Sequence, residues 1–181
     1  MSEKIDKAIR LWALDVANGA KESGKEILVI PAYSNTVRPT DSREPVACPP
    51  SHSGLYITVS REAVQVMASA SRAYETEAGV CELCVTERKR ARYKLRAYRE
   101  GAMDVIELLT ASVQAAHIYQ NHFAGNGLSR PEFGEVTDIY ELMGGLFEPR
   151  AEVTLSVDYN DVKTSALCTF EPCLEGVAQG C

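Results

Sequence analysis

The stretch TERKRARYKLRAYREGAMDVIELLTASVQAAHIYQNHF, residues 86–123, decides the predicted fold because it contains no proline and reads as one helix. At about 1.5 Å per residue such a helix would exceed about 50 Å, so we expect it to be the central element. Gly101 marks a point where it could kink. Seam positions recur in it at alternating three- and four-residue steps: Leu95, Tyr98, Ala102, Val105, Leu109, Ser112, Ala116, Tyr119 and Phe123. This pattern fits either a core helix or a coiled-coil homodimer formed through residues 95–123.

Hydrophobic periodicity predicts the elements before this helix. Apolar residues at helical spacing predict an amphipathic helix over residues 3–20, and a short apolar run predicts a buried strand at 27–30. Residues 31–54 contain five prolines and are expected to form an irregular loop. Alternating residues predict a strand over 55–59, and Ser60 looks like the N-cap of a helix that ends near Ala78.

After the long helix, the pattern predicts a short helix near 136–143 and a strand beginning at Val153. Asn160 and Asp161 suggest a tight turn, after which residues 162–170 would return as the partner strand. Residues 171–181 are expected to form a flexible tail. The sum is a single α+β domain over 1–181, in which a small, mainly antiparallel sheet of three or four strands packs with three or four helices.

Composition places the chain among soluble globular proteins, with 45% hydrophobic and 24% charged residues. The longest apolar run, about Ile27 to Tyr33, is too short to span a membrane, and residues 1–10 lack a secretory signal pattern. We therefore expect a cytoplasmic protein with no membrane partner. The net charge of −6 argues against nucleic-acid binding over the whole surface.

One short run nevertheless concentrates positive charge. Residues 88–99 hold seven of the 19 Lys and Arg residues and none of the 25 Asp and Glu residues, so the rest of the chain has a net charge of −13. A helix would align four of these arginines in one stripe, which predicts a site for nucleic acid or an acidic partner. The alternative is a solvated or internally neutralised face. The candidate residues are Arg88, Lys89, Arg90, Arg92, Lys94, Arg96 and Arg99, with Tyr93 available to stack on a base.

Four residues form a candidate metal site. Cys81 and Cys84 have the spacing at which two thiolates reach one zinc ion, and a structural site needs two further ligands. Cys48 and His52 in the proline-rich loop could supply them, giving one structural zinc ion as the only expected cofactor. Two alternatives stay open: the cysteines are small buried hydrophobic residues, or Cys81 and Cys84 form a thiol-redox pair.

The sequence contains no nucleophile elbow, phosphate-binding loop or dinucleotide fingerprint. The charge run therefore predicts a non-enzymatic regulatory or inhibitory protein. Its partner would be nucleic acid or a nucleic-acid-processing protein, and it would bind through the predicted basic helix. The alternative is a small zinc-dependent or thiol-redox enzyme that uses Cys48, His52, Cys81 and Cys84.

Overall fold

The computed structural model describes residues 2–22, 24, 26–31, 54–75, 81–143 and 146–166. Within these ranges six strands form one sheet and three α-helices are present. The helices are α1 (Ser2–Glu22), α2 (Ala102–Ser112) and α3 (Ala116–Ile118), the last followed by a π-helical turn (Tyr119–Phe123) and a 3-10 turn (Ala124–Asn126). The strands are β1 (Ile27–Pro31), β2 (Leu55–Glu75), β3 (Cys81–Tyr98), β4 (Glu132–Phe133), β5 (Thr137–Met143) and β6 (Leu146–Ala166).

Three long strands dominate the sheet, whose order is β1-β2-β3-β6-β4, with β5 also paired to β6. Strand β3 lies at the centre and runs antiparallel to both β2 and β6. Strand β1 is parallel to the first residues of β2, from Leu55 to Val59, and forms one edge of the sheet. Because β1 stops there, the rest of β2 has no second neighbour among the described strands.

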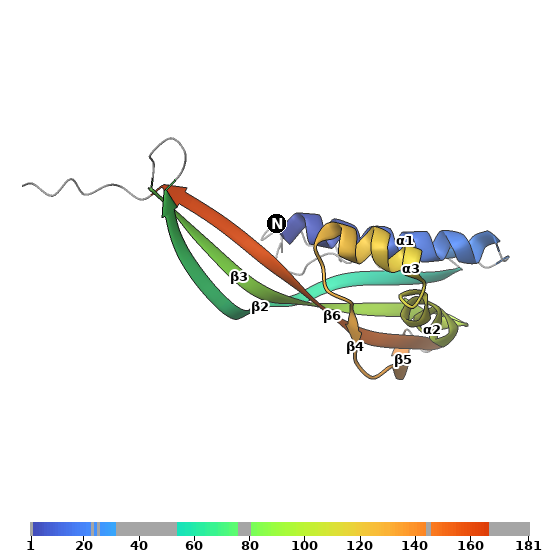
Figure 1. Cartoon of the computed structure of the whole chain (residues 1–181). Coiled ribbons are helices and arrows are strands. Elements are labelled where there is room, and N and C mark those ends of the chain that lie inside the picture. The colour runs from blue at the N-terminus through green and yellow to red at the C-terminus, as the bar shows by residue number, and fades with distance from the viewer. Residues whose placement is uncertain are drawn as a thin grey trace, which may run out of the picture.

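The helices cover one face of one half of the sheet (Figure 1). We call this half of the sheet, together with the helices, the body. Trp12 of α1 is fully buried, and its Nε1 donates a hydrogen bond of 3.0 Å to Ser112 Oγ of α2. Its ring also meets Phe123 edge-on, with ring centroids 5.5 Å apart. The buried side chains of α1 recur at helical spacing, as expected for a helix with one face on a core.

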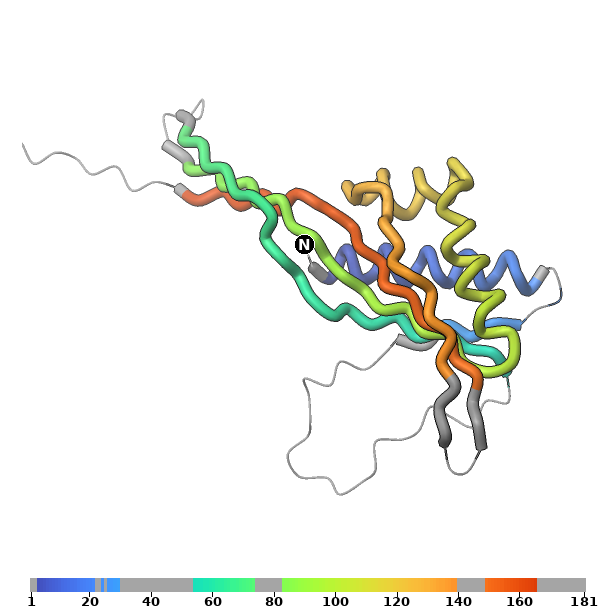
Figure 2. The backbone as a smooth tube through the Cα atoms, turned by 90° about the horizontal axis from the view of Figure 1, so that it is seen from below, coloured from blue at the N-terminus to red at the C-terminus, as the bar shows by residue number. Residues whose placement is uncertain are grey.

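The other halves of β2, β3 and β6 extend beyond the helices as a twisted three-stranded arm (Figures 1 and 2). We define the arm as residues 63–75, 81–90 and 158–166. In β2 every side chain from residue 61 to 73 is exposed, so this strand has no core on either face. The arm is therefore a sheet without the apolar layer that normally stabilises one.

The predicted long helix at 86–123 is wrong. Residues up to Tyr98 belong to β3, the chain turns at residues 99–101, and α2 begins at Ala102. Gly101 has φ +85°, a left-handed conformation that glycine adopts without strain, so the helix break falls at the predicted weak point. The predicted seam residues Leu95, Val105 and Leu109 are buried in the core of one chain, so the coiled-coil homodimer is also wrong.

Some of the other predicted elements are confirmed and others are wrong. The first helix and the strand at 27–30 are confirmed as α1 and β1, and the α+β class holds. The predicted sheet of three or four strands is too small: residues 60–75 continue β2, and 137–143 form β5, where helices were expected. Strand β6 runs through Asn160 and Asp161 without the predicted turn. The single-domain assignment stays a prediction, and the tail at 171–181 and nearly all of the predicted loop lie outside the described residues.

Candidate functional site: the basic face of the strands

The basic run lies on a β-strand, and this decides where its charges point. Alternate residues of β3 face opposite sides of the sheet, and those facing the helices are buried: Ala91, Tyr93, Leu95 and Ala97. The other side, which we call the outer face, carries the basic row: Arg88, Arg90, Arg92, Lys94 and Arg96. Arg99 lies in the turn after β3, with φ 87°. Tyr93 points inward and donates a hydrogen bond of 2.7 Å to Asp6, so its ring is not offered to a base.

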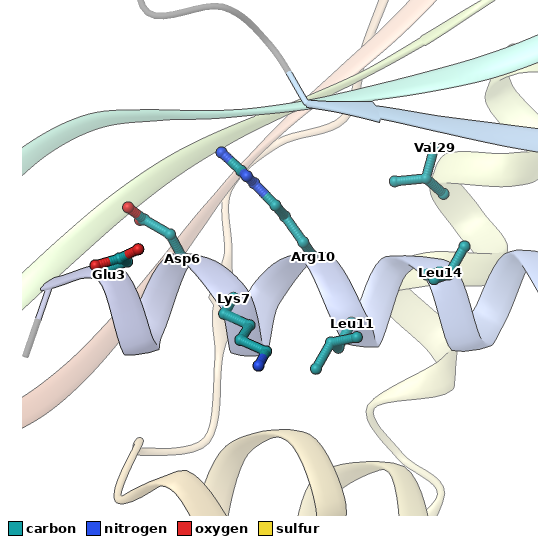
Figure 3. A pocket seen from close by; sticks show the side chains of 7 residues that line it. All are labelled: Glu3, Asp6, Lys7, Arg10, Leu11, Leu14 and Val29. Carbon is teal, nitrogen blue, oxygen red and sulfur yellow. The ribbon is translucent and has the colours of Figure 1, made fainter.

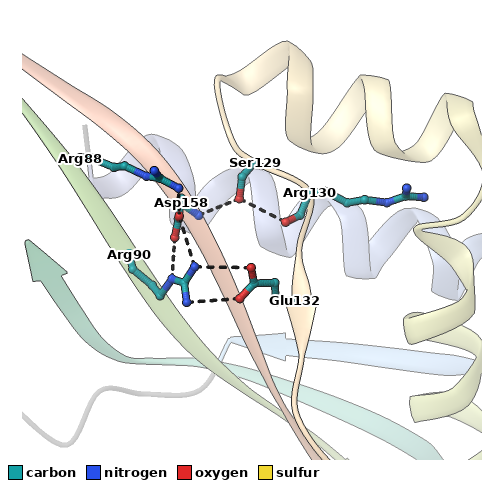
Figure 4. Close-up of polar contacts among 6 residues, drawn as sticks. All are labelled: Arg88, Arg90, Ser129, Arg130, Glu132 and Asp158. Atoms are coloured by element: carbon teal, nitrogen blue, oxygen red, sulfur yellow. Dashed lines mark hydrogen bonds and ion pairs between the residues drawn. The ribbon is translucent and has the colours of Figure 1, made fainter. Parts of the chain in front are cut away.

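Most of the basic row is neutralised by carboxylates from other strands of the sheet, and Figure 4 shows these contacts for Arg88 and Arg90. Asp158 of β6 is only 8% exposed and accepts hydrogen bonds from Arg88 (2.7 Å) and from Arg90 Nε (2.6 Å). Arg90 also pairs with Glu132 of β4 at 3.2 Å. Farther along, Glu152 of β6 accepts hydrogen bonds of 3.2 Å from both Lys94 and Arg96. These contacts support the internally neutralised alternative for most of the row.

Arg92 is the exception. It is exposed between Arg90 and Lys94, and the register places it opposite Ala63 of β2 and Ser156 of β6. Neither neighbour can supply a counter-charge, and no hydrogen bond or ion pair joins the Arg92 side chain to any described residue. The outer face therefore presents one uncompensated guanidinium at the junction of arm and body.

The helix-side face of the arm has a second ionic cluster. Lys89 contacts Asp161 of β6 at 2.6 Å and Glu87 of its own strand at 2.8 Å. Lys163 adds a longer contact of 3.5 Å to Glu87. Ion pairs thus join β3 and β6 on both faces of the arm, at the level where the apolar core ends.

These contacts shift the pKa values of the carboxyls on both faces of the sheet. The hydrogen bond from Arg90 holds the pKa of Asp158 below its ordinary value, and that from Lys89 does the same for Asp161 and Glu87. Burial raises the pKa of Glu152, but the hydrogen bonds from Arg96 and Lys94 outweigh it and leave that pKa lowered. Conversely, the pKa of Lys89 is raised, chiefly by its hydrogen bond to Asp161. The charged forms are therefore the ones that the fold favours.

A groove lies between α1 and β1 and is lined by both charged and apolar side chains (Figure 3). It has a volume of about 580 Å³, and Leu14 of α1 and Val29 of β1 point toward one another in it. Leu11 and Leu14 are 45% and 43% exposed, which is high for leucine in a helix packed on a sheet. The remaining lining residues are charged and belong to α1: Glu3, Asp6, Lys7 and Arg10.

The predicted zinc ligands are not brought together among the described residues. Cys81 and Cys84 lie within β3, in an extended strand and not in the expected knuckle between two helices. Cys84 is a half-buried free thiol, and Cys48 and His52 lie outside the described residues. No group of three or more His, Cys, Asp and Glu side chains able to hold a metal ion occurs in the described ranges. The zinc-binding assignment is therefore unsupported.

Comparison with known proteins identifies the family. A family model described as phage neck terminator protein matches residues 4–176. The chain belongs to this family. The match spans both the helices of the body and all three strands of the arm. A search of curated proteins found no significant match.

Membership of the phage neck terminator family corrects the functional predictions. The family consists of structural components of the virion, so both the regulatory or inhibitory nucleic-acid-binding protein and the zinc or thiol enzyme are wrong. The family supports a partner that is a protein, and a nucleic-acid partner is not supported. In the described part of the chain, no helix is long and apolar enough to cross a bilayer.

Sequence reasoning missed the groove and the β2 side of the arm. A signal for the groove was present, because Leu11 and Leu14 are apolar yet lie outside the stripe formed by Ile5, Ile9, Trp12 and Val16. The sequence signal for a strand at β2 was weaker, because residues 62–75 contain several alanines, two glutamates and a methionine, and these residue types favour a helix. The sequence located the basic run correctly but predicted a helix for it, whereas it lies on strand β3.

Proposed function

We propose that this chain is a structural protein of the phage neck that acts by binding another protein of the particle, with no catalytic step. The surface proposed for this contact is the outer face of β3 around Arg92. Its partner is an acidic surface on a head or tail protein of the same phage.

The observation that carries this proposal is the charge balance of the outer face. Among the described residues, its five cations contact four carboxylates, and none of these four contacts Arg92. Arginine suits this role because its planar guanidinium binds a carboxylate through two parallel hydrogen bonds. The carboxylates are Asp158, Glu132, Glu152 and Glu62.

The neutralised neighbours of Arg92 support binding to a protein surface. A protein that binds the phosphate backbone uses several uncompensated cations, whereas this row offers one. A protein partner needs only local charge complementarity, and the flanking ion pairs fix the positions of the side chains around Arg92. This arrangement favours one specific contact over a long polyanion.

The proposal is tested by co-expressing the chain with the head, neck and tail proteins of its phage and measuring what co-purifies. Arg92→Glu is expected to reduce capture of the partner by about tenfold or more, because it places two like charges in contact. Arg92→Lys keeps the charge and should retain part of the binding. Lys21→Glu, which reverses an exposed cation at the far end of α1, is the matched control and should leave capture unchanged.

Two results would contradict the proposal at different levels. Unchanged capture by Arg92→Glu would remove this surface as the binding site, while leaving a structural role intact. Mass spectrometry of purified particles tests that role directly, because a neck protein must be present in the virion. Absence of the chain from infectious particles would remove the structural role itself.

A further inference from the structure

A second groove lies among the helices of the body, between the C-terminal half of α1 and helix α2, and we call it the α1/α2 groove. Helix α3 and Ile27, the first residue of β1, complete its walls. Its volume is about 630 Å³, which lies within the range of about 300–1,000 Å³ that is usual for binding pockets. None of the described residues that line it belongs to β3, so the groove is separate from the surface around Arg92.

The lining of the α1/α2 groove is largely apolar and includes one exposed leucine. Val16, Val105 and Ile118 form part of its walls and are at most 8% exposed. Leu108 of α2 also lines the groove, but it is 40% exposed. A partner side chain that enters the groove would remove this leucine from water, which favours binding.

Gly19 leaves part of the groove unfilled by the chain itself. It is an exposed residue in the last turn of α1, and its φ is not positive. A Cβ atom placed on Gly19 would have no atom within 4 Å, so crowding within the described structure does not require glycine here. Glycine destabilises a helix relative to alanine. The open space above Gly19 is therefore room that a partner can occupy.

The charges of the groove favour a basic occupant. Among the described residues that line it, Asp15 and Asp104 are acidic and none is Lys or Arg. The side chain of Asp15 is 51% exposed, and its contact of 3.0 Å with His122 involves only Oδ2. A carboxylate has acceptor sites on both oxygens, so Asp15 can pair with a further cation. The last turn of α1 adds the partial negative charge of a helix C-terminus.

We propose that the α1/α2 groove binds a segment of another protein in which an apolar side chain lies next to a lysine or arginine. The apolar side chain packs against Leu108 in the space above Gly19, and the cation pairs with Asp15. Two walls of the groove are helices, whose main-chain groups are largely paired within each helix. Recognition therefore depends on side chains, and the segment does not add a strand to the sheet.

This surface differs in chemistry from the one around Arg92. The outer face of β3 suits an acidic partner surface, whereas the α1/α2 groove suits a basic one. The chain can therefore hold two different neighbours at once. The proposed structural role is used here only to choose the probes.

The first experiment measures the binding of short overlapping peptides that span the head, neck and tail proteins of the same phage and this chain itself. Each peptide carries a fluorescent label, and fluorescence anisotropy reports its binding to the full chain. At least one foreign peptide with an apolar residue next to Lys or Arg is expected to bind with a Kd below about 100 μM. Replacement of that Lys or Arg by Glu should abolish binding to the wild-type chain.

Gly19→Leu tests whether the peptide enters the groove. The added side chain occupies the open space and is expected to weaken peptide binding by about tenfold or more. Leucine favours a helix more than glycine does, so the Tm of this variant should not fall. Ala111→Leu is the matched control, because it adds leucine at an exposed position of α2 that does not line the groove, and it should bind like the wild type.

A charge exchange tests the pairing with Asp15. Asp15→Lys should weaken binding of the basic peptide by about tenfold or more, and the Lys/Arg→Glu peptide should bind this variant more tightly than it binds the wild type. Glu107→Lys reverses an exposed charge on α2 outside the groove and is the matched control. Arg92→Glu should also bind the peptide like the wild type.

Four outcomes would overturn the proposal. They are no binding of any foreign peptide up to about 100 μM, binding of acidic peptides only, full binding by a folded Gly19→Leu variant, and equal weakening by Glu107→Lys and Asp15→Lys. Binding of peptides from this chain alone would indicate self-association instead and would also overturn it. None of these outcomes removes the proposed structural role, because the presence of the chain in purified particles is measured separately.

Discussion

Strand β3 passes through two environments, and its two halves are stabilised by different means. In the body its alternate residues Tyr93, Leu95 and Ala97 are at most 2% exposed beneath the helices. In the arm the same strand has no helix above it, and Lys89 and Arg90 hold β6 through ion pairs of 2.6 Å. The apolar core is thus replaced by a double row of charge contacts within one continuous strand.

This difference predicts that the two halves of the sheet differ in stability. Burial of apolar side chains is the dominant favourable term in folding, so the body should set the global stability. Partly exposed ion pairs contribute much less and are screened by salt. The arm is therefore expected to open locally at a lower cost than the body, and it is the region where binding to another protein adds the most order.

Removal of a core side chain is the largest expected effect. Leu109 of α2 is fully buried, so Leu109→Ala should lower the free energy of unfolding by about 2–5 kcal/mol, measured by urea denaturation. Its neighbour Leu108 is 40% exposed on the same helix and provides the matched control, with an expected change within about 0.5 kcal/mol. In the arm, Val66→Ala should cost less than about 1 kcal/mol. A loss for Val66→Ala equal to that for Leu109→Ala would show that the arm contributes to the folding core.

Acid is the next largest perturbation, and it should act on the arm first. The carboxyls of Asp158 and Asp161 have pKa values below their ordinary 3.8, and the pKa of Glu87 lies below its ordinary 4.5. A lowered folded-state pKa gives stability that is fully present above the ordinary value and is lost as pH falls through the lowered one. Below about pH 4 the arm amides should therefore lose hydrogen-exchange protection, corrected for intrinsic rates, before those of the body.

The single tryptophan provides an internal reference for this experiment. Trp12 is buried in the body, so its fluorescence should stay native while the arm opens. Asp158→Asn removes one titrating carboxyl and should reduce the pH dependence of protection at residues 88–90. Simultaneous loss of protection in arm and body would mean that the two halves of β3 unfold as one unit.

The same contrast explains how much of the fold could be predicted from the sequence. Helix α1 was predicted because its apolar residues recur at helical spacing on a local core. The run Arg90-Ala91-Arg92-Tyr93-Lys94-Leu95-Arg96-Ala97 has a strict period of two, and this signal for a strand was present but outweighed by the four-residue spacing of the arginines. In the arm part of β2 no burial pattern exists, because both faces are exposed. Its strand conformation depends on pairing with β3, a contact that local propensity does not encode.

The candidate site was predictable in composition but not in geometry. Charge counting located the basic row, whereas the partners of Arg88 and Arg90 come from β6 and β4, some 40 to 70 residues later in the chain. Which cation remains uncompensated follows only from the strand register, and that register is a non-local property. The identity of Arg92 as the exceptional residue therefore required the fold.

The smallest expected effect on stability belongs to Arg92, and it gives the sharpest test of the comparison between body and arm. Arg92 has no charged partner in the described structure, so Arg92→Ala should change the free energy of unfolding by no more than about 0.5 kcal/mol. Arg90→Ala is the matched variant two residues away, and it should be more destabilising because it leaves the buried Asp158 with Arg88 alone. Urea denaturation measures both. If Arg92→Ala also lowers capture of the partner while Arg90→Ala mainly lowers stability, two adjacent cations of one row serve different purposes. Equal destabilisation by the two variants would place Arg92 in the same structural network as its neighbours.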